Sequence, residues 1–225
     1  MSSGITGCEL GPMVRIFNEA WNRGGRAYAL WQNVPKVERK LFRMGVEPMA
    51  ELDYRSIHPS LLYAEHGLSV PDDCYDIPGY QSKGDRDKVK LAVVILINAD
   101  TLNSAVMALA AEIENQARGH RGLKILTRTE DIPGYRLNEA RRLIEAVKIH
   151  HKPIRAAFHS GAGARLQAID AAIAEAVWWT MYTRGVVVLP VHDSFIVQES
   201  KAAELEEVMI DAAEKVAGVA LAVQH

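Results

Sequence analysis

The 225-residue sequence has little cysteine, no long hydrophobic run and no excess of positive charge. Its two cysteines, Cys8 and Cys74, are far apart and form no CxxC pair, so we expect reduced thiols without a metal or redox role. The absence of any run of about 18 apolar residues excludes a membrane-spanning helix. The opening residues, MSSGITGCELGPM, lack the charged and then apolar segments of a signal peptide, which favours a cytoplasmic protein.

The composition is that of a folded globular domain. Hydrophobic residues make up 48% of the chain and charged residues 24%, whereas disordered chains are less apolar. A chain of this length can bury one sizeable core. No internal repeat and no low-complexity linker interrupts it, so we predict one domain over residues 1–225, with a basic N-terminal segment at 1–46.

The net charge of −2 is a mild argument against a nucleic-acid partner, because phosphate binding usually requires a basic surface. The cations are nevertheless gathered in two regions, and an acidic stretch at 199–214 lowers the total. The first region holds Arg15, Arg23, Arg26, Lys36, Arg39, Lys40 and Arg43. The second holds Arg136, Arg141, Arg142, Lys148, His150, His151, Lys152, Arg155 and Arg165. Two such surfaces are compatible with a nucleic-acid groove, and solvated helix faces are an equal alternative for each residue.

Apolar spacing and turn residues predict helices and strands in an order that gives an α+β fold. Residues at helical spacing, bounded by Gly and Pro, predict helices at Met13–Trp21, Pro59–His66, Asp85–Ala117, Leu137–His150, Ala162–Tyr182 and Glu204–Val216. The segment EPMAELDY at Glu47–Tyr54 predicts a strand. The run VVVLPVHD, followed at once by SFIVQE, predicts a hairpin with an aspartate at its tip. Between Ser69 and Gly84, the density of Pro, Gly and Asp predicts a connecting loop.

Two aspartates, Asp53 and Asp193, stand where an apolar strand meets a turn. Rigid strand ends often carry functional side chains. Two carboxylates brought together repel one another unless a divalent cation neutralises them, and Mg²⁺ suits a site with few protein ligands. Such a pair can bind the attacking and leaving oxygens of a phosphoryl transfer through its metals. The residues alone leave the alternative that each aspartate is a helix cap or a turn residue.

Segments around these aspartates resemble the palm of family A DNA polymerases and of the single-subunit phage and mitochondrial RNA polymerases. The segment GVVVLPVHDSFIVQESKAAELEEVMIDAAEKV resembles their third motif, a hairpin that reads His-Asp-Ser-Phe in the RNA polymerases. Phe158–Val177 resembles the His-Ser segment and helix that precede this hairpin. The segment ELDYRSIHPSLLYAEHG resembles the first motif and also the family B motif Asp-Phe-x-Ser-Leu-Tyr-Pro-Ser. Gly25–Lys36 is similar to the Gly-Arg and Gln-Asn-x-Pro stretches before the first motif.

The resemblance covers most of the chain in the order of the family, and it implies a fold, a cofactor and a catalytic pair. The implied fold is a palm-like antiparallel sheet packed on helices, with a reduced fingers helix at 85–118 and little or no thumb. The implied cofactor is Mg²⁺ or Mn²⁺. Asp53 and Asp193 are the implied catalytic and metal-binding residues, and Tyr54 would contribute its backbone carbonyl to a metal.

The fingers motif of the family, Arg-x-x-x-Lys followed by Tyr-Gly, is present in part. Arg86 and Lys90 have the first spacing and lie one helical turn apart, so both cations project from one face. By resemblance they bind the triphosphate of the incoming nucleotide; a solvated helix start is the alternative. Ile97 and Asn98 stand at the place of the Tyr-Gly pair, so the residue that helps to gauge the new base pair is missing and nucleotide selection is expected to differ.

His58, the fifth residue after Asp53, occupies the position at which the polymerase families distinguish sugars. Family B enzymes have an aromatic residue there, family A DNA polymerases a glutamate and the RNA polymerases a glycine. A bulky ring implies nucleotide contact and exclusion of ribonucleotides, whereas the third motif is closer to the RNA polymerases, so the sugar preference stays open. A histidine packed at a helix start is an equal alternative.

The resemblance also implies contacts with nucleic acid, from Arg26, His159, Ser160 and His192. His159 and Ser160 correspond to a pair that contacts the minor groove of the primer–template duplex in the family. His192, beside one catalytic aspartate, either orients the primer end or packs the hairpin.

The leading hypothesis is a DNA-directed nucleotidyltransferase, a small DNA polymerase or primase of a mobile element. Its partners would be a DNA template or primer, nucleoside triphosphates and an accessory replication protein that replaces the missing thumb in holding the DNA. No membrane partner is expected. A second hypothesis is a catalytically inactive palm that binds nucleic acid or a replication partner, favoured by the missing Tyr-Gly pair and the neutral charge. A third is a nuclease or phosphohydrolase with the same metals, which the order of the motifs disfavours.

Overall fold

The computed structural model describes residues 11–18, 20–82, 84–119 and 132–225, so Cys8 lies outside the described residues. The chain forms two compact units. The first unit comprises Met1–Leu61 and Arg165–His225, and the second comprises Leu62–Ala164. The assignment of residues 1–225 to one palm-like domain stays a prediction.

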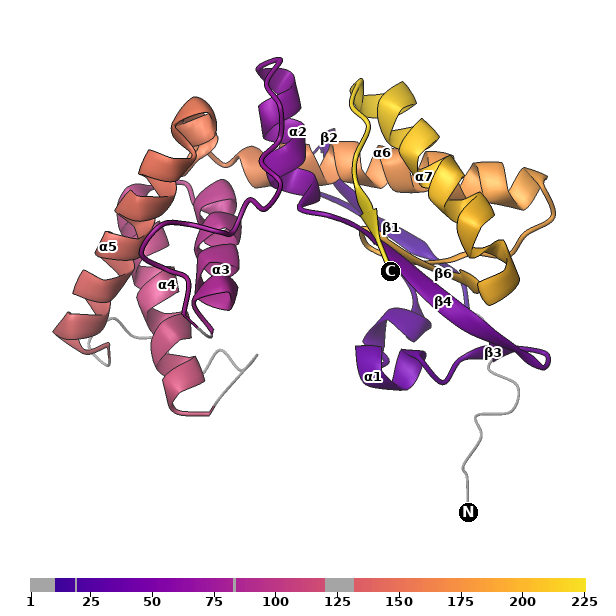
Figure 1. Cartoon of the computed structure of the whole chain (residues 1–225), viewed down its shortest axis with the longest axis horizontal. Helices are drawn as coiled ribbons and strands as arrows, with labels where there is room; N and C mark the ends of the chain where they lie inside the picture. Colours follow the sequence, from indigo (N-terminus) through magenta and orange to yellow (C-terminus); the bar gives the residue numbers. More distant parts are fainter. Residues whose placement is uncertain (1–10, 19, 83, 120–131) are drawn as a thin grey trace. The chain divides into compact units, whose positions relative to one another are not determined.

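The first unit is built on an antiparallel sheet. Its strands are β3 (Arg43–Met44), β4 (Glu47–Tyr54), β5 (Leu189–Val191), β6 (Ser194–Gln198) and β7 (Val223–Gln224). Their order is β3-β4-β6-β5, and β7 pairs with the end of β4. The predicted strand Glu47–Tyr54 and the predicted hairpin are confirmed. Helix α7 (Ala202–Ala217) lies against β4 and β6 (Figure 1).

The two faces of this sheet pack against different elements because side chains alternate along a strand. Leu52 and Phe195 pair across β4 and β6 and are fully buried with Tyr54, whose hydroxyl reaches the backbone of α7. The other face packs on the 3-10 helix η1 (Leu30–Asn33): Ile196 clusters there with Trp31 and the β5 residues. Asp53 belongs to this second face, because it alternates with Leu52 and Tyr54.

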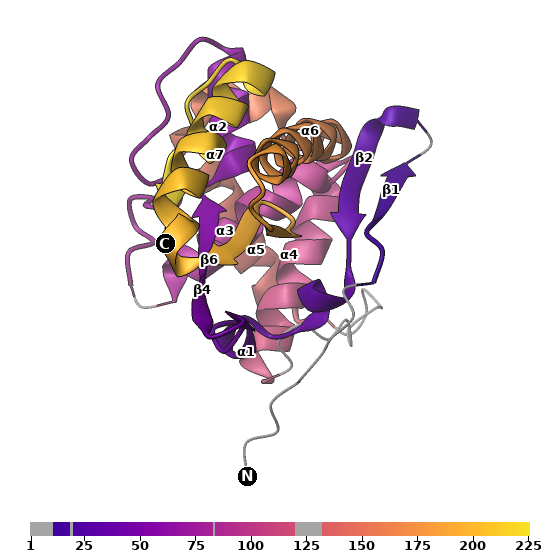
Figure 2. The ribbon, with the colours of Figure 1, turned by 90° about the vertical axis from the view of Figure 1, so that its right-hand side faces the viewer.

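A β-hairpin precedes the sheet, where the sequence predicted a helix at Met13–Trp21; that prediction was wrong. Strands β1 (Val14–Asn18) and β2 (Ala20–Tyr28) pair antiparallel with two register shifts (Figure 2). The helical spacing of Phe17 and Trp21 has another cause: their rings meet edge to face within the hairpin, with centroids 4.6 Å apart. Gly24 and Gly25 take positive φ angles within β2, and their backbone freedom permits the irregular register.

Further helices follow the strands. The short helix α1 (Lys36–Arg39) precedes β3, and helix α2 (Ile57–Glu65) begins three residues after β4. The long helix α6 (Ala162–Thr183) leads to β5. Both α2 and α6 agree closely with predicted helices, and residues 66–84 contain no helix or strand among those described, as the loop prediction required.

The second unit is a cluster of three helices, α3 (Asp85–Asn98), α4 (Leu102–Ala117) and α5 (Gly134–His150). The sequence predicted one helix over Asp85–Ala117, and this was wrong. The backbone becomes extended at Ala99, and a new helix starts at Thr101. The Thr101 hydroxyl accepts a hydrogen bond from the backbone N–H of Ser104. In return, the backbone N–H of Thr101 donates to the Ser104 hydroxyl over 3.2 Å. A capping pair of this kind fixes a helix start even where the apolar pattern runs through.

The predicted α+β class, with an antiparallel sheet packed on helices, is confirmed. Within the described part of the chain, every helix is too short or too polar to cross a membrane.

Candidate active site

Asp53 lies near the end of β4, and Asp193 lies in the turn between β5 and β6, at the same end of the sheet. Asp53, the last residue but one of β4, pairs with Ser194, which directly follows Asp193. The backbone N–H of Tyr54 donates to the backbone carbonyl of Asp193 over 3.2 Å. Neighbouring strands are about 4.8 Å apart, so the backbones of the two aspartates lie close together at this end of the sheet, and shared ion binding stays a prediction. The fold thus brings together residues that are far apart in the sequence.

The carboxylate of Asp53 is contacted from the edge strand β7. Gln224 pairs with Asp53 in the β4–β7 register, and its Nε2–H donates to Asp53 Oδ2 over 3.2 Å. Hydrogen bonds to a metal-binding carboxylate fix its orientation. Gln224 therefore supports one defined orientation of the predicted ligand.

A second carboxylate on the same face, Glu51, is committed to an ion pair. Arg39 donates to both of its oxygens, at 2.8 and 3.1 Å, and the Ser194 hydroxyl donates to Oε1 at 3.1 Å. Burial acts to raise the pKa of Glu51, but hydrogen bonds and charge from Arg39 outweigh it and hold that pKa below its usual value. Glu51 is thus ionised and neutralised, and its role is to attach α1 to the sheet beside Asp53.

The donor set fits the predicted cofactor. Among the described residues, no three His, Cys, Asp or Glu side chains converge as a metal site. Asp53 and Asp193 supply hard oxygen donors, which suit Mg²⁺ or Mn²⁺ rather than softer metals. Mg²⁺ keeps several waters and binds through one or two carboxylates together with substrate phosphates, so two aspartates meet its needs.

Tyr54 directs its side chain away from the aspartates. Its hydroxyl donates to the backbone carbonyl of Met209 over 2.5 Å, and its side chain is 2% exposed. Burial, followed by the nearby charge of Asp170, raises the pKa of the Tyr54 phenol. The phenol is thus a neutral anchor to α7, and the role of the Tyr54 backbone carbonyl at a metal stays a prediction.

Arg26 and His58 meet at a buried carboxylate that the sequence analysis did not single out, Asp170 of α6. Arg26 Nε donates to Asp170 Oδ2 over 2.8 Å, and Nη2 contacts the same oxygen. His58 Nε2 lies 3.7 Å from that oxygen, beyond hydrogen-bond distance. Burial would raise the pKa of Asp170, but His58 and Arg26 hold it below its usual value. The available signal was one acidic residue in the apolar run AIDAAI.

His192 occupies the turn before Asp193 in a left-handed conformation, with φ of 59°. Its ring packs edge to face on Tyr28, with centroids 5.5 Å apart. Burial, then the charge of Arg26, lowers the pKa of His192. Its Nδ1 is buried without a hydrogen-bond partner in the described structure. Of the two predicted roles, these contacts favour packing of the hairpin.

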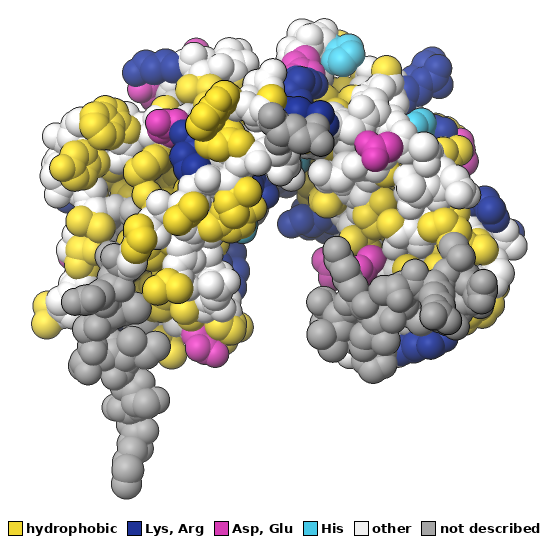
Figure 3. Space-filling model, turned by 180° about the vertical axis from the view of Figure 1, so that it is seen from behind, with side chains coloured by type: hydrophobic (Ala, Val, Ile, Leu, Met, Phe, Trp, Pro, Cys, Tyr) yellow, Lys and Arg dark blue, Asp and Glu magenta, His cyan; other side chains and the backbone are white. Residues whose placement is uncertain are grey.

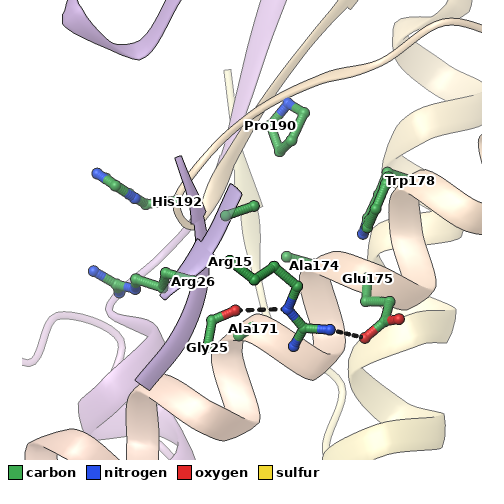
Figure 4. Close-up of a pocket in the computed structure, with 10 residues that line it drawn as sticks. Arg15, Gly25, Arg26, Ala171, Ala174, Glu175, Trp178, Pro190 and His192 are labelled. Atoms are coloured by element: carbon green, nitrogen blue, oxygen red, sulfur yellow. Dashed lines mark hydrogen bonds and ion pairs between the residues drawn. The ribbon is translucent and has the colours of Figure 1, made fainter. Parts of the chain in front are cut away.

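A small pocket lies beside His192, between β2, α6 and the turn after β5 (Figure 4). Arg15 spans it: Nε donates to the carbonyl of Gly25 at 2.9 Å and Nη1 to Glu175 at 2.6 Å. Trp178 and Pro190 complete the wall. The contacts of Arg15 hold the β1–β2 hairpin on α6, so the pocket is part of the packing between these elements, next to the candidate site.

Arg86 and Lys90 belong to the second unit, on α3. Arg86 is bound to Asp73, with Nε to Oδ2 at 2.9 Å and Nη2 to Oδ1 at 3.2 Å, and its guanidinium lies over the Tyr75 ring. The hydrogen bond with Asp73 raises the pKa of Arg86 further. Lys90, one turn later, is exposed. The predicted pair therefore shares a helix face, but Arg86 is occupied by an acidic partner.

His159 and Ser160 also lie in the second unit, in the turn before α6. His159 has a φ of 43°, and its backbone N–H donates to the Leu96 carbonyl over 2.6 Å. Its Nε2 is buried and has no hydrogen-bond partner among the described residues. Ser160 is exposed and donates to the Ala157 carbonyl. The turn is thus held to α3 by its backbone.

The two predicted basic regions contain many ion pairs, which reduces their positive surface. Arg15, Arg26 and Arg39 bind carboxylates, as do Arg136 and Lys148 in the second region. On the face drawn in Figure 3, Lys and Arg side chains form several separate groups. For Arg15, Arg136 and Lys148, the alternative of solvated, ion-paired side chains describes the arrangement, and the nucleic-acid groove stays a prediction.

No family model and no curated protein matches the sequence. Among solved structures, the chain is similar to the POL domain of Pol1 from M. smegmatis, whose structure includes a DNA primer–template and a dNTP. The TM-score is 0.44 and the sequence identity is 15%, over 94% of this chain and 46% of that chain. The chain thus spans about half the length of that structure, and the similarity is a distant structural one.

Proposed function

We propose that this chain catalyses template-directed nucleotidyl transfer as a small DNA polymerase or primase. The observation that supports this best is the position of Asp53 near the end of β4 beside Asp193 in the β5–β6 turn, where the N–H of Tyr54 donates to the Asp193 carbonyl. Bound Mg²⁺ or Mn²⁺ would supply Lewis-acid stabilisation of the attacking and leaving oxygens of a phosphoryl transfer. Asp53, Asp193 and the Tyr54 carbonyl would hold these ions.

The chain itself contributes rigid placement of the two carboxylates. Asp53 is carried by a strand paired on both sides, with β6 and β7, and Gln224 orients its carboxylate. Asp193 is fixed by the tight turn of the β5–β6 hairpin. Two neighbouring carboxylates repel each other, so bound cations would stabilise the site by neutralising this charge.

The substrates in this proposal are a DNA template or primer and nucleoside triphosphates. Arg86 and Lys90 would bind the triphosphate, for which Arg86 must exchange Asp73 for a phosphate. His58 would contact the sugar of the incoming nucleotide. Contacts with nucleic acid would come from His159 and Ser160, because Arg26 is bound to Asp170 and His192 packs on Tyr28.

The test is incorporation of labelled nucleotide on a primed and an unprimed DNA template, with Mg²⁺ and with Mn²⁺, for deoxy- and ribonucleotides. Asp53→Asn and Asp193→Asn should each lower the rate by roughly 100-fold or more, because each removes a charged ligand of the cations that would stabilise the transition state. Asp211→Asn is the matched control, since Asp211 is a solvent-exposed aspartate of α7 that pairs with Lys215. Circular dichroism checks that each variant is folded, and Mn²⁺ titration followed by electron paramagnetic resonance measures ion binding without substrate.

A second candidate is a catalytically inactive palm that binds nucleic acid, and it is favoured by the state of the fingers helix. Arg86 is bound to Asp73, and Ile97, at the place of the missing tyrosine, is buried. This candidate predicts DNA binding without incorporation under every condition, and equal behaviour of Asp53→Asn and the wild type. A nuclease would instead shorten the labelled DNA, which the same gel reveals.

A further inference from the structure

Asp170 is the feature of the first unit that the proposed function leaves unexplained. Asp170 is 1% exposed, less than the other buried carboxylate residue of the described structure, Glu114, which is 6% exposed. It lies on a helix segment that is otherwise apolar. A buried carboxylate is costly unless it is paired. A hydrophobic residue would pack there without this cost, so the contacts of Asp170 require an account.

Those contacts join two elements at one oxygen atom. Arg26, from β2, binds Oδ2 through Nε at 2.8 Å and through Nη2. His58, from the first turn of α2, places Nε2 at 3.7 Å from the same oxygen. The His58 nitrogen is buried without a hydrogen-bond partner in the described structure. The Asp170 carboxylate is thus a buried acceptor beside a His58 Nε2 that is otherwise unpartnered among the described residues.

The position of His58 in the chain connects this contact to the predicted site. His58 follows Asp53 by five residues, and α2 begins three residues after the strand that carries Asp53. The side chain of His58 is only 15% exposed, so its rotation is already limited by packing. Asp170 also lies near Tyr54 and His192, because its charge acts on the pKa of both. The charge of Asp170 thus acts on two residues that are next to the predicted catalytic aspartates in the chain.

We propose that Asp170 is a positioning residue for sugar selection, which fixes the His58 ring and the Arg26 guanidinium in one arrangement. This inference rests on the proposed function, in which His58 contacts the nucleotide sugar. A ring can exclude a 2′-hydroxyl only if it does not rotate away, and a buried carboxylate beside Nε2 favours one orientation of the ring. The substrate class that fits is the 2′-deoxynucleoside triphosphates.

The kinetic test compares kcat/KM for a deoxynucleotide with that for the matching ribonucleotide. Asp170→Asn should lower this ratio by roughly tenfold, the scale of a lost steric contact. His58→Ala should lower it at least as much, and the double variant should equal His58→Ala because Asp170 acts through the ring. Glu175→Gln is the matched control: it removes a carboxylate of the same helix that pairs with Arg15, and the ratio should stay unchanged.

A second measurement is independent of activity. In protein without nucleotide or metal, the ¹⁵N spectrum of the imidazoles, assigned with His58→Ala, should show His58 protonated at Nε2 in one defined tautomer. Asp170→Asn should change that signal, whereas Glu175→Gln should not. If Asp170→Asn does not fold, Arg26→Met/Asp170→Asn removes both charges and keeps the volume, and it should show the same spectral change and the same lower ratio.

The outcomes separate the two proposals. An active wild type whose sugar ratio is unchanged by Asp170→Asn, or by the charge-free double variant, overturns the role of Asp170 and leaves the proposed function standing. A wild type that incorporates no nucleotide refutes the proposed function, and sugar selection by Asp170 with it. A His58 spectrum unaffected by loss of the carboxylate also overturns the positioning role.

Discussion

Acidification should destabilise the second unit through one buried histidine, His151. Its side chain is fully buried at the end of α5, between Tyr63 and the backbone of Cys74. Nε2 lies 2.8 Å from the Cys74 carbonyl and must be the protonated nitrogen, so Nδ1 accepts from the Tyr63 hydroxyl at 3.0 Å. The sequence analysis counted His151 among the cations of a basic surface, and this was wrong because the ring is neutral and inside.

The size of the effect follows from the pKa. Burial, partly offset by the hydrogen bond to Cys74, lowers the pKa of His151 from 6.5 to about 4. The unfolded chain therefore binds a proton between these values while the folded chain does not, and stability falls as the pH is lowered through that window. The full difference is about 3 kcal/mol, because one pKa unit corresponds to about 1.4 kcal/mol. Well above pH 6.5 the ring is neutral in both the folded and the unfolded chain, so this loss of stability is absent.

Urea unfolding at a series of pH values from 7.5 to 4 measures this loss, with His151→Gln as the reference. Glutamine keeps a donor and an acceptor but does not titrate, so its stability should vary less between pH 6.5 and 4.5 than that of the wild type. Carboxylates with lowered pKa values, such as Glu114 and Glu139, lose their contribution at lower pH and are common to both proteins. Parallel pH profiles for the wild type and the variant would refute the reasoning.

Three further substitutions test other parts of the structure. Gly25→Ala should destabilise the hairpin by roughly 1–3 kcal/mol in thermal unfolding, because φ is +85° and an added Cβ would lie 2.8 Å from Phe17 Cε1; an unchanged melting temperature would contradict this. Thr101→Ala should cost about 1 kcal/mol by removing the cap of α4, whereas Thr183→Ala, away from that cap, serves as its control. Gln224→Leu should weaken Mn²⁺ binding, measured by titration, by roughly tenfold or more, because it removes the hydrogen bond to Asp53. Gln224→Glu serves as a second variant that separates the effect of charge from that of orientation. Equal Mn²⁺ affinity in the wild type and both variants would exclude an orienting role for Gln224.

The sheet was predictable because its pattern is local. The hairpin around Asp193 consists of two runs of β-branched residues separated by a polar turn, and Glu47–Tyr54 is a short segment that ends at an aspartate. The hairpin β1–β2 was missed because Phe17 and Trp21 are four residues apart, a separation that brings side chains together both on a helix and across a tight hairpin. The break at Ala99–Thr101 was missed because a cap made by two hydroxyls leaves no gap in the apolar pattern.

The candidate site was predictable only as far as its residues lie at strand ends. Asp53 and Asp193 could be found because an aspartate after an apolar run is conspicuous. Asp170, Glu51 and Gln224 could not be assigned, because their roles depend on partners that are distant in the sequence. Such pairings follow from the tertiary arrangement, and spacing along the chain carries no information about them.

The same pairings change the meaning of the net charge. Arg26 and Arg39 are bound to Asp170 and Glu51, all of them largely buried, so each pair contributes almost no field at the surface. Counterion release on binding DNA depends on exposed cations that can approach phosphates. The charge of −2 therefore neither excludes nor supports a nucleic-acid partner. Exposed cations such as Lys90 would contact the phosphates of such a partner. The affinity would then fall as the salt concentration rises, and more steeply the more of these contacts there are.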